Sequence, residues 1–195
     1  DDNYWERISI HPAKLIPKDM VEPRLLAPST PEVLVHAATD GKRIIFHLKW
    51  KDSTNNDIPG PAKFSDACAI QLPVMTSPDV PAPQMGEVEK PVEISFWSAV
   101  MQAKAEGKFK TLKEIYPNAS VGHYPFQATP LTPGSKAQKE MALLYSPAIA
   151  LGNPVAKVEN AVQDLIAEGP GSLHPAGKNT SVGFGKRTSD GWDVT

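Results

Sequence analysis

The stretch PQMGEVEKPVEISFW, residues 83–97, predicts a loop that leads into a β-strand. Met85 lies in a proline-rich context, and Gly86 follows it where the backbone has to turn or to approach another group closely. Val92, Ile94 and Phe96 then alternate with polar residues, as in a strand with one apolar face. A thioether at the entrance of such a strand can bind a soft metal, and the apolar face beside it can cover a flat cofactor. The same residues also fit a methionine that fills a gap in the core.

The composition indicates one mainly β domain. A chain of 195 residues is long enough for a single domain with a substantial core, which we expect to span residues 1–195. Twenty prolines and thirteen glycines, in a chain that is still 41% hydrophobic, favour many short strands joined by proline-rich loops. The net charge of −2 and the pI near 6.2 provide no basic surface for nucleic acid or anionic lipid.

Cysteine usage and hydropathy exclude several classes of site. Cys68 is the only cysteine, which excludes an internal disulfide, a cysteine-rich zinc site, a cysteine-ligated cluster and a CxxCH haem attachment. A haem would therefore have to be bound noncovalently. The sequence contains no run of about eighteen apolar residues, so it predicts no membrane-spanning helix. The start Asp1-Asp2-Asn3 fits a processed, exported protein, although a shortened chain would look the same.

Alternation and turn residues predict the main elements. The clearest is an antiparallel hairpin, in which the segments 32–39 and 42–50 are joined by the two-residue turn Asp40-Gly41. We also expect strands at 4–10, 64–73 and 92–97, a helix within 98–114 with a break at Gly107, and a closing hairpin of 181–185 with 192–194. The segment 141–149 fits either a strand or a helix.

The search for catalytic motifs is negative. GxSxG, HExxH, Walker A and a GxGxxG that opens a helix are all absent from the sequence. The five histidines do not pair at metal-ligand spacing, and only His47, which alternates with an apolar strand face, is a candidate for a special role. The polar loop 51–63 could bind Ca²⁺ or simply be solvated. The excursion 120–139, with His123-Tyr124-Pro125-Phe126, could dock a partner or cover a cofactor edge.

Several motifs together resemble a known family. In order along the chain they are Trp50-x-Asp52, FSDACAIQLP at 64–73, Met85-Gly86 followed by Pro91-Val92 and Trp97, Gly152-Asn153-Pro154, AEGPGSL at 167–173, and Gly191-Trp192-x-Val194. This series resembles the haem b-binding γ subunits of periplasmic molybdenum enzymes of the dimethyl sulfoxide reductase family. Ethylbenzene dehydrogenase, dimethylsulfide dehydrogenase, selenate reductase and chlorate reductase carry such subunits, and we favour chlorate reductase. Residues 98–148 contribute little to the resemblance.

The resemblance implies a fold and a ligand pair. The fold would be an antiparallel β-sandwich, immunoglobulin-like or DOMON-like, with a few short helices in the middle excursion. It would hold one noncovalent haem b between a methionine and a lysine. Met85 matches the family's methionine. We favour Lys178, in the loop ahead of the last hairpin, as the second axial ligand of the iron, with Lys186 as second choice and His174 as third. All three also fit surface residues of a polar loop.

Such a ligand pair would make the subunit an electron carrier. A lysine binds iron only as the neutral amine, so burial and the charge of the metal must lower its pKa from the usual ~10.4. Methionine sulfur favours reduced iron, and a haem with both axial positions filled passes electrons without bond chemistry. The resemblance implies a noncatalytic periplasmic subunit that relays single electrons between a soluble c-type cytochrome and an iron–sulfur β subunit, which leads to a molybdenum α subunit.

The alternative function is that of a cofactor-free β-sandwich that binds a carbohydrate or a protein. The four tryptophans would then be core and platform residues: Trp5, Trp50, Trp97 and Trp192. A visible absorption spectrum distinguishes the two functions, because only the haem protein has a Soret band.

Overall fold

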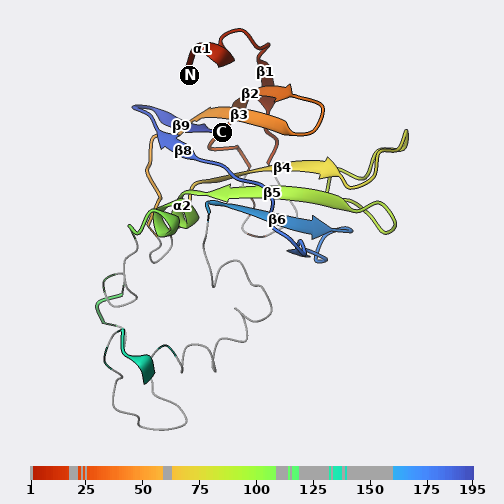
Figure 1. Cartoon of the computed structure of the whole chain (residues 1–195). Coiled ribbons are helices and arrows are strands. Elements are labelled where there is room, and N and C mark those ends of the chain that lie inside the picture. The colour runs from red at the N-terminus through yellow and green to blue at the C-terminus, as the bar shows by residue number, and fades with distance from the viewer. Residues whose placement is uncertain are drawn as a thin grey trace. The chain divides into compact units, whose positions relative to one another are not determined.

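The computed structural model describes residues 2–17, 22, 24, 26–58, 63–108, 114, 116–118, 132, 134–137, 139 and 160–195. The chain divides into two compact units (Figure 1). Unit 1 comprises Asp1–Asn56 and Gly183–Thr195, and unit 2 comprises Asp57–Val182. The prediction of a single domain over residues 1–195 stays a prediction.

Unit 1 is built on a five-stranded antiparallel sheet with the strand order β1-β2-β3-β9-β8. After the short helix α1 (Asp2–Trp5), its elements are β1 (His11–Lys14), β2 (Glu32–Thr39), β3 (Ile44–Lys51), β8 (Gly185–Arg187) and β9 (Gly191–Val194). The predicted closing hairpin is present, because β8 and β9 pair antiparallel, but its first strand covers 185–187 instead of the predicted 181–185. Leu48, Trp50, Trp192 and Val194 are the buried apolar residues of this sheet.

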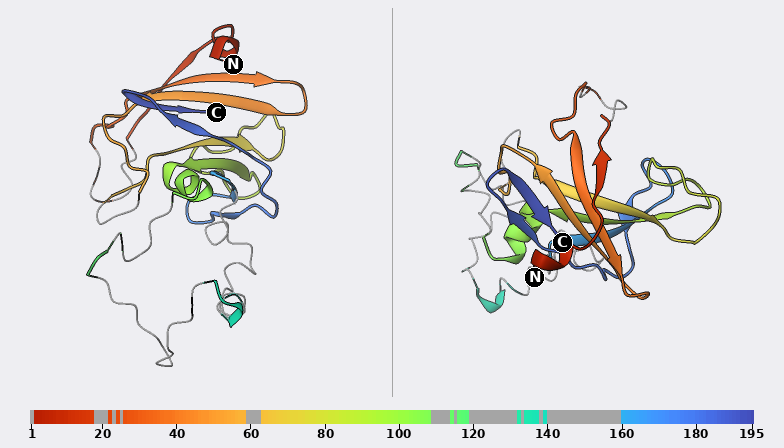
Figure 2. Two further views of the ribbon diagram at one scale, coloured as in Figure 1. Left: turned by 60° about the vertical axis from the view of Figure 1, so that its left-hand side comes forward. Right: turned by 90° about the horizontal axis from the view of Figure 1, so that it is seen from above.

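Unit 2 contains a four-stranded antiparallel sheet with the order β4-β5-β6-β7. Its elements are β4 (Ala67–Pro73), β5 (Val92–Ser98), the helix α2 (Ala99–Ala105), β6 (Val162–Ala167) and β7 (His174–Pro175). Figure 2 shows the yellow-green loop between β4 and β5 at the same end of unit 2 as the blue turn that follows β6. The predicted fold class is confirmed, since the described chain is mainly antiparallel β with two sheets and short helices.

The start of the chain differs from the prediction. The predicted strand at 4–10 is wrong, because residues 2–5 form α1 and the first strand is β1, which includes Pro12. Proline lacks the N–H that a central strand needs, but β1 is an edge strand and pairs only with β2. Pro12 is therefore tolerated inside β1.

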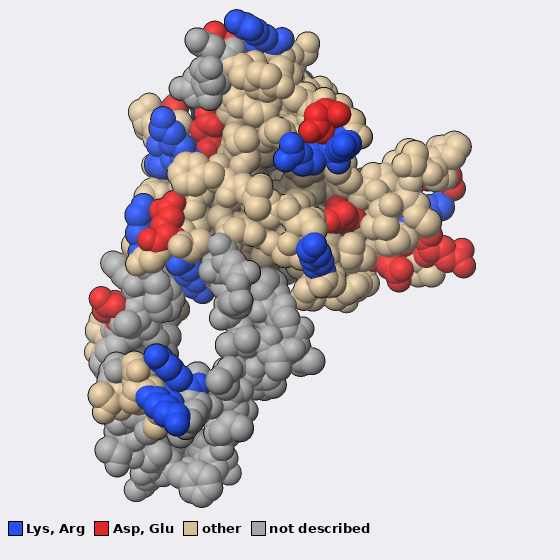
Figure 3. Space-filling view, viewed as in Figure 1, with Lys and Arg blue, Asp and Glu red and all other residues tan. Residues whose placement is uncertain are grey.

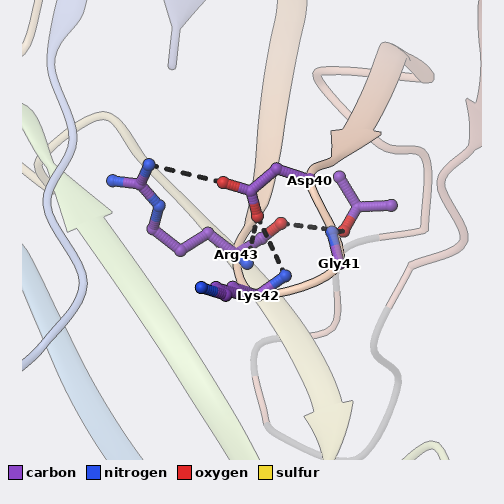
Figure 4. Close-up of polar contacts among 5 residues, drawn as sticks. Asp40, Gly41, Lys42 and Arg43 are labelled. Carbon is purple, nitrogen blue, oxygen red and sulfur yellow. Dashed lines mark hydrogen bonds and ion pairs between the residues drawn. The ribbon is translucent and has the colours of Figure 1, made fainter.

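The first hairpin is confirmed, but its turn is displaced by one residue. Thr39 pairs with Ile44, so Gly41 and Lys42 form the tip instead of Asp40 and Gly41. The Asp40 carboxylate accepts hydrogen bonds from the backbone N–H groups of Lys42, at 2.9 Å, and Arg43, at 2.7 Å (Figure 4). These bonds lower the pKa of Asp40, that from Arg43 most. Gly41 supplies the positive φ of +83° that the turn requires.

Two predicted elements of unit 2 are shorter than expected. β4 begins at Ala67 instead of Phe64, because Ser65 and Asp66 bind the start of α2. The Ser65 hydroxyl accepts from Val100 N at 3.1 Å, and the carbonyl of Asp66 accepts from Ala99 N at 2.9 Å. The helix predicted within 98–114 is confirmed as α2, and Gly107, at φ +74°, lies just beyond its end. The segments 121–126 and 141–149 lie outside the described residues.

Candidate functional site

Met85 lies in the long loop between β4 and β5, residues 74–91, which we call the Met85 loop. Its side chain is half-buried and packs with Leu165 against a buried apolar cluster of Val92, Ile94 and Ala167. The carbonyl of Met85 accepts a hydrogen bond of 2.8 Å from the backbone N–H of Gly169, in the turn after β6. The motifs Met85-Gly86 and AEGPGSL, which lie far apart in the sequence, therefore meet in unit 2.

Gly86 fits its position because no side chain can be accommodated there. Its φ is +76°, and a Cβ atom would lie 2.9 Å from the carbonyl oxygen of Lys90, 3.1 Å from that of Ala167 and 3.3 Å from Cγ1 of Val92. Backbone oxygens cannot move aside as the end of a flexible side chain can. The close packing of the Met85 loop on β5 and β6 therefore depends on glycine.

Met85 itself has a left-handed backbone, with φ +67°. Among the described residues, it shares this conformation only with Glu89 (φ +70°) outside the glycines. For a side chain with a Cβ atom, this region costs roughly 1–2 kcal/mol. Such strain persists only where the surrounding structure fixes it, and it is common at ligand-binding positions.

Lys90 ties the Met85 loop together. Its ammonium group lies 2.5 Å from the carboxylate of Asp79 and 2.9 Å from that of Glu87. These hydrogen bonds, led by the one to Asp79, raise the pKa of Lys90. Glu87 and Lys90 also form a backbone bridge. In Figure 3 the acidic side chains of this part of unit 2 project at the right-hand side.

The sheet face that Met85 contacts is mainly apolar and only partly covered, and the register also places Gln71 and Gln163 on it. Register and alternation place Phe96 and Leu165 on the same face as Ile94. Phe96 and Leu165 are half-buried, whereas Ile94 is only 8% exposed. A thioether beside a partly open apolar surface is an arrangement that can bind a flat apolar group through one polarizable donor.

The three predicted partners of Met85 lie in two different units. Lys178 and His174 belong to unit 2, as Met85 does, while Lys186 lies in β8 of unit 1. Lys178 is exposed, and within the described part of the chain it makes no hydrogen bond or ion pair. His174 is exposed in β7, and its Nδ1 donates to the carbonyl of Ser172 at 3.0 Å.

Asp164 is a buried residue of unit 2 that the sequence reasoning missed. Its side chain, in the middle of β6, accepts hydrogen bonds from Thr180, Ser181 and Ser95, and the residue is 2% exposed. Burial raises its pKa, but the hydrogen bonds, led by those of Ser181, outweigh this effect and leave the pKa below its usual value. The sequence could have indicated this residue, because Asp164 interrupts the mainly apolar run AVQDLIA. A buried aspartate in such a strand needs hydrogen-bond partners.

Unit 1 contains a second buried polar cluster, around His47. The rings of His36 and His47 stack with their centroids 5.5 Å apart, and the ring centroid of Trp5 lies 4.7 Å from that of His47. Nε2 of His47 hydrogen-bonds to Asp193, whose other oxygen lies 3.2 Å from Lys49 Nζ. His47, a candidate for a special role on the sequence alone, thus lies in a buried polar cluster whose other members the sequence did not reveal, and its role stays a prediction.

Among the described residues, histidine, cysteine and carboxylate side chains do not form a metal site. Within the described ranges, no three such residues lie close enough to hold a metal ion. In the loop considered for Ca²⁺, Asp52 Oδ1 accepts two hydrogen bonds of 2.8 Å from Thr54, as in an ordinary Asx turn. In the parts of the chain that can be described, no helix has the length and apolar character needed to cross a membrane.

Comparison with known proteins adds two findings. A family model described as ethylbenzene dehydrogenase matches residues 2–123, which include Met85 and end before β6. A protein from Haloferax mediterranei, named as a putative respiratory nitrate reductase heme subunit, is 38% identical over 66 residues, which are 33% of this chain and 24% of that protein. The match thus spans about a quarter of the relative's length.

Proposed function

The chain belongs to the ethylbenzene dehydrogenase family, and we propose on this basis that it is an electron-transfer subunit that binds one b-type haem noncovalently. The relative from Haloferax mediterranei, which is named as a haem subunit of a respiratory reductase, supports this proposal. We infer that the chain is noncatalytic by itself and serves a molybdenum oxidoreductase.

The single observation that carries the proposal is the environment of Met85. A thioether is held at a strained backbone position, on a loop packed by Gly86, and it packs beside half-buried Leu165 on the sheet face that also carries half-buried Phe96. These residues fit a haem, because a soft donor beside an apolar surface matches the axial sulfur ligation and the apolar faces of the porphyrin. A methionine that only filled a gap in the core would need neither the strain nor the open surface.

Lys178 is the proposed second ligand. It is exposed and unengaged within the described residues, and it lies in the same unit as Met85. The Met85 loop and the segment that contains Lys178 are both attached to β6, the first through Gly169, two residues after that strand, and the second through Asp164, whose side chain points to the face opposite Leu165. Lys186 remains the second choice and His174 the third.

The proposed role in the complex follows from this ligand set. A haem held by two protein ligands supplies one-electron chemistry and has no position for a substrate. The chain would position the haem edge, exclude water from it and present a surface to each partner. We propose an iron–sulfur β subunit leading to a molybdenum α subunit on one side, and a soluble c-type cytochrome in the periplasm on the other. For the parent enzyme we favour an oxyanion reductase such as chlorate reductase, because the relative is named for nitrate, another oxyanion.

The test is the absorption spectrum of the purified chain supplied with haem. We expect a Soret band with six-coordinate low-spin features, which Met85→Ala converts to a five-coordinate or weakly bound form. Met75→Ala is the matched control, because Met75 lies in the same loop but is 56% exposed. We expect Lys178→Ala to change the spectrum and Lys186→Ala to leave it unchanged. A folded chain that shows no visible absorption with haem supplied would favour the cofactor-free module that binds a carbohydrate or a protein.

A further inference from the structure

The strand β6 holds both loops that carry the proposed iron ligands. At its end, the carbonyl of Ala167 packs against Gly86, and Gly169 N binds the carbonyl of Met85. Three residues earlier, Asp164 binds the segment 176–181, which we call the lysine loop because it contains Lys178. Three residues of extended strand span about 10 Å. One short strand therefore fixes where both loops are attached.

Asp164 binds the lysine loop through its side chain. Its Oδ2 accepts hydrogen bonds from Thr180 N at 2.6 Å, Ser181 N at 2.8 Å and Thr180 Oγ1 at 3.3 Å. Its Oδ1 accepts from Ser95 Oγ at 3.3 Å, and Ser95 Oγ also lies 3.0 Å from Ser181 Oγ. Hydrogen bonds to an ionised carboxylate are roughly twice as strong as those between neutral groups.

The backbone around Asp164 binds the other side of the same loop. The carbonyl of Asp164 accepts from Ala176 N at 2.8 Å, and Asp164 N donates to the side chain of Asn179 at 2.5 Å. Asn179 Nδ2 in turn donates to the carbonyl of Val162 at 3.0 Å. The amide of Asn179 thus pairs with β6 much as a neighbouring strand would.

These contacts fix the lysine loop on both sides of Lys178 and leave Lys178 itself exposed. Ala176 precedes it, and Asn179, Thr180 and Ser181 follow it, all bound to β6 or to Asp164. A ligand on a pre-ordered loop loses less entropy when it binds a metal than one on a free loop. We propose that Asp164 is a positioning residue, which holds the lysine loop so that Lys178 is presented to the haem iron; this inference rests on the proposed function.

The test compares Asp164→Asn with Lys178→Ala in the haem-loaded chain. Asparagine keeps the shape of the side chain but removes the charge, so the hydrogen bonds from Thr180 and Ser181 weaken without deletion of the residue. We expect Asp164→Asn to retain the fold and the Met85 ligand, with about tenfold more of the lysine-free, high-spin form. Lys178→Ala should give that form completely. Asp190→Asn, on the exposed turn between β8 and β9, is the matched control and should resemble the wild type.

Two further readouts separate positioning from general stability. In the loaded chain, an amine reagent should label Lys178 several-fold faster in Asp164→Asn than in the wild type, as measured by mass spectrometry. In the haem-free chain, amide hydrogen exchange in residues 176–181 should accelerate while that of β5 stays unchanged. If Asp164→Asn does not fold, Asn179→Ala, which removes the second attachment, should produce the same labelling change.

The outcomes distinguish this inference from the proposed function. If Lys178→Ala changes the spectrum while Asp164→Asn and Asn179→Ala retain wild-type spectra and labelling, the positioning role is wrong and the proposed function stands. If Lys178→Ala has the wild-type spectrum, the ligand assignment itself is wrong and the inference fails with it. Partial loss of the low-spin form in Asp164→Asn, with complete loss in Lys178→Ala, supports both.

Discussion

Replacing Gly86 with alanine should destabilise unit 2 by about 3 kcal/mol. The backbone contribution is roughly 1–2 kcal/mol, because an alanine pays a steric penalty at the φ of +76°. The packing contribution is about 1–3 kcal/mol, because the added Cβ would approach the carbonyl oxygens of Lys90 and Ala167 to 2.9 and 3.1 Å. The entropy that alanine removes from the unfolded chain offsets up to about 1 kcal/mol of the sum.

Gly171→Ala is the matched control for this prediction. Gly171 has a similar φ of +87° and lies in the turn after β6, but a Cβ there would meet nothing within 4 Å. Gly171→Ala should therefore lower the free energy of unfolding only by the backbone penalty, about 1 kcal/mol.

Urea unfolding, followed by circular dichroism, measures both variants. With an m-value of about 2 kcal/mol per molar, Gly86→Ala should lower the midpoint by roughly 1 M or more, and Gly171→Ala by about half as much or less. Equal midpoints for the two variants would refute the close approach of the Met85 loop to β5 and β6. If the Gly86→Ala chain has normal stability but an altered haem spectrum, the added methyl group displaces Met85 and does not disturb the packing of the loop on β5 and β6.

Three further predictions concern the side chains of Cys68, Asp164 and Asp193. Burial raises the pKa of the Cys68 thiol to about 12, so disulfide reagents at pH 8 should modify it about a thousandfold more slowly in the folded chain than in urea; comparable rates would contradict this. Folding lowers the pKa of Asp164, so its ionised carboxylate stabilises the folded chain. The difference in unfolding free energy between the wild type and Asp164→Asn should be complete above about pH 4 and should decline as the pH falls through the folded-state pKa of Asp164. An unfolding difference that does not change between pH 7 and pH 2 would argue against it. Asp193→Asn should cost about 1–3 kcal/mol in urea unfolding, because it weakens the bond to buried His47 and the ion pair with Lys49, whereas Asp190→Asn should change stability by less than about 0.5 kcal/mol.

The first hairpin illustrates what the sequence could and could not predict. Alternation placed β2 and β3 correctly, since the apolar residues recur with a period of two. Asp40-Gly41 is a favoured turn pair, but the Asp40 side chain binds Lys42 N and Arg43 N and so fixes the turn one residue later. That shift sets His36 opposite His47. The predicted turn would have set His36 opposite Ile45, so the histidine pair could not have been found from the sequence.

Contacts between distant segments were also beyond local patterns. Alternation reveals which residues share a face of β5, but not that a turn after β6 binds the carbonyl of Met85. The same holds for Asp164, whose partners follow it by sixteen and seventeen positions across β7. The resemblance brought these motifs together as an ordered series, and the structure supplies a physical reason for part of that series, since Gly86, Ala167 and Gly169 are in contact.

This dependence on β6 also bears on how a haem would be acquired. The family match ends at residue 123, so it includes Met85 but neither β6 nor the lysine loop. The Met85 loop, however, needs β6, because Ala167 and Gly169 supply two of its contacts. Contacts of such long sequence separation form late, since the entropy of closing the intervening chain is lost before they stabilise the fold. We therefore expect the ordering of both ligand loops to depend on the pairing of β5 with β6, and a chain that ends before β6 should bind haem with neither proposed ligand in place.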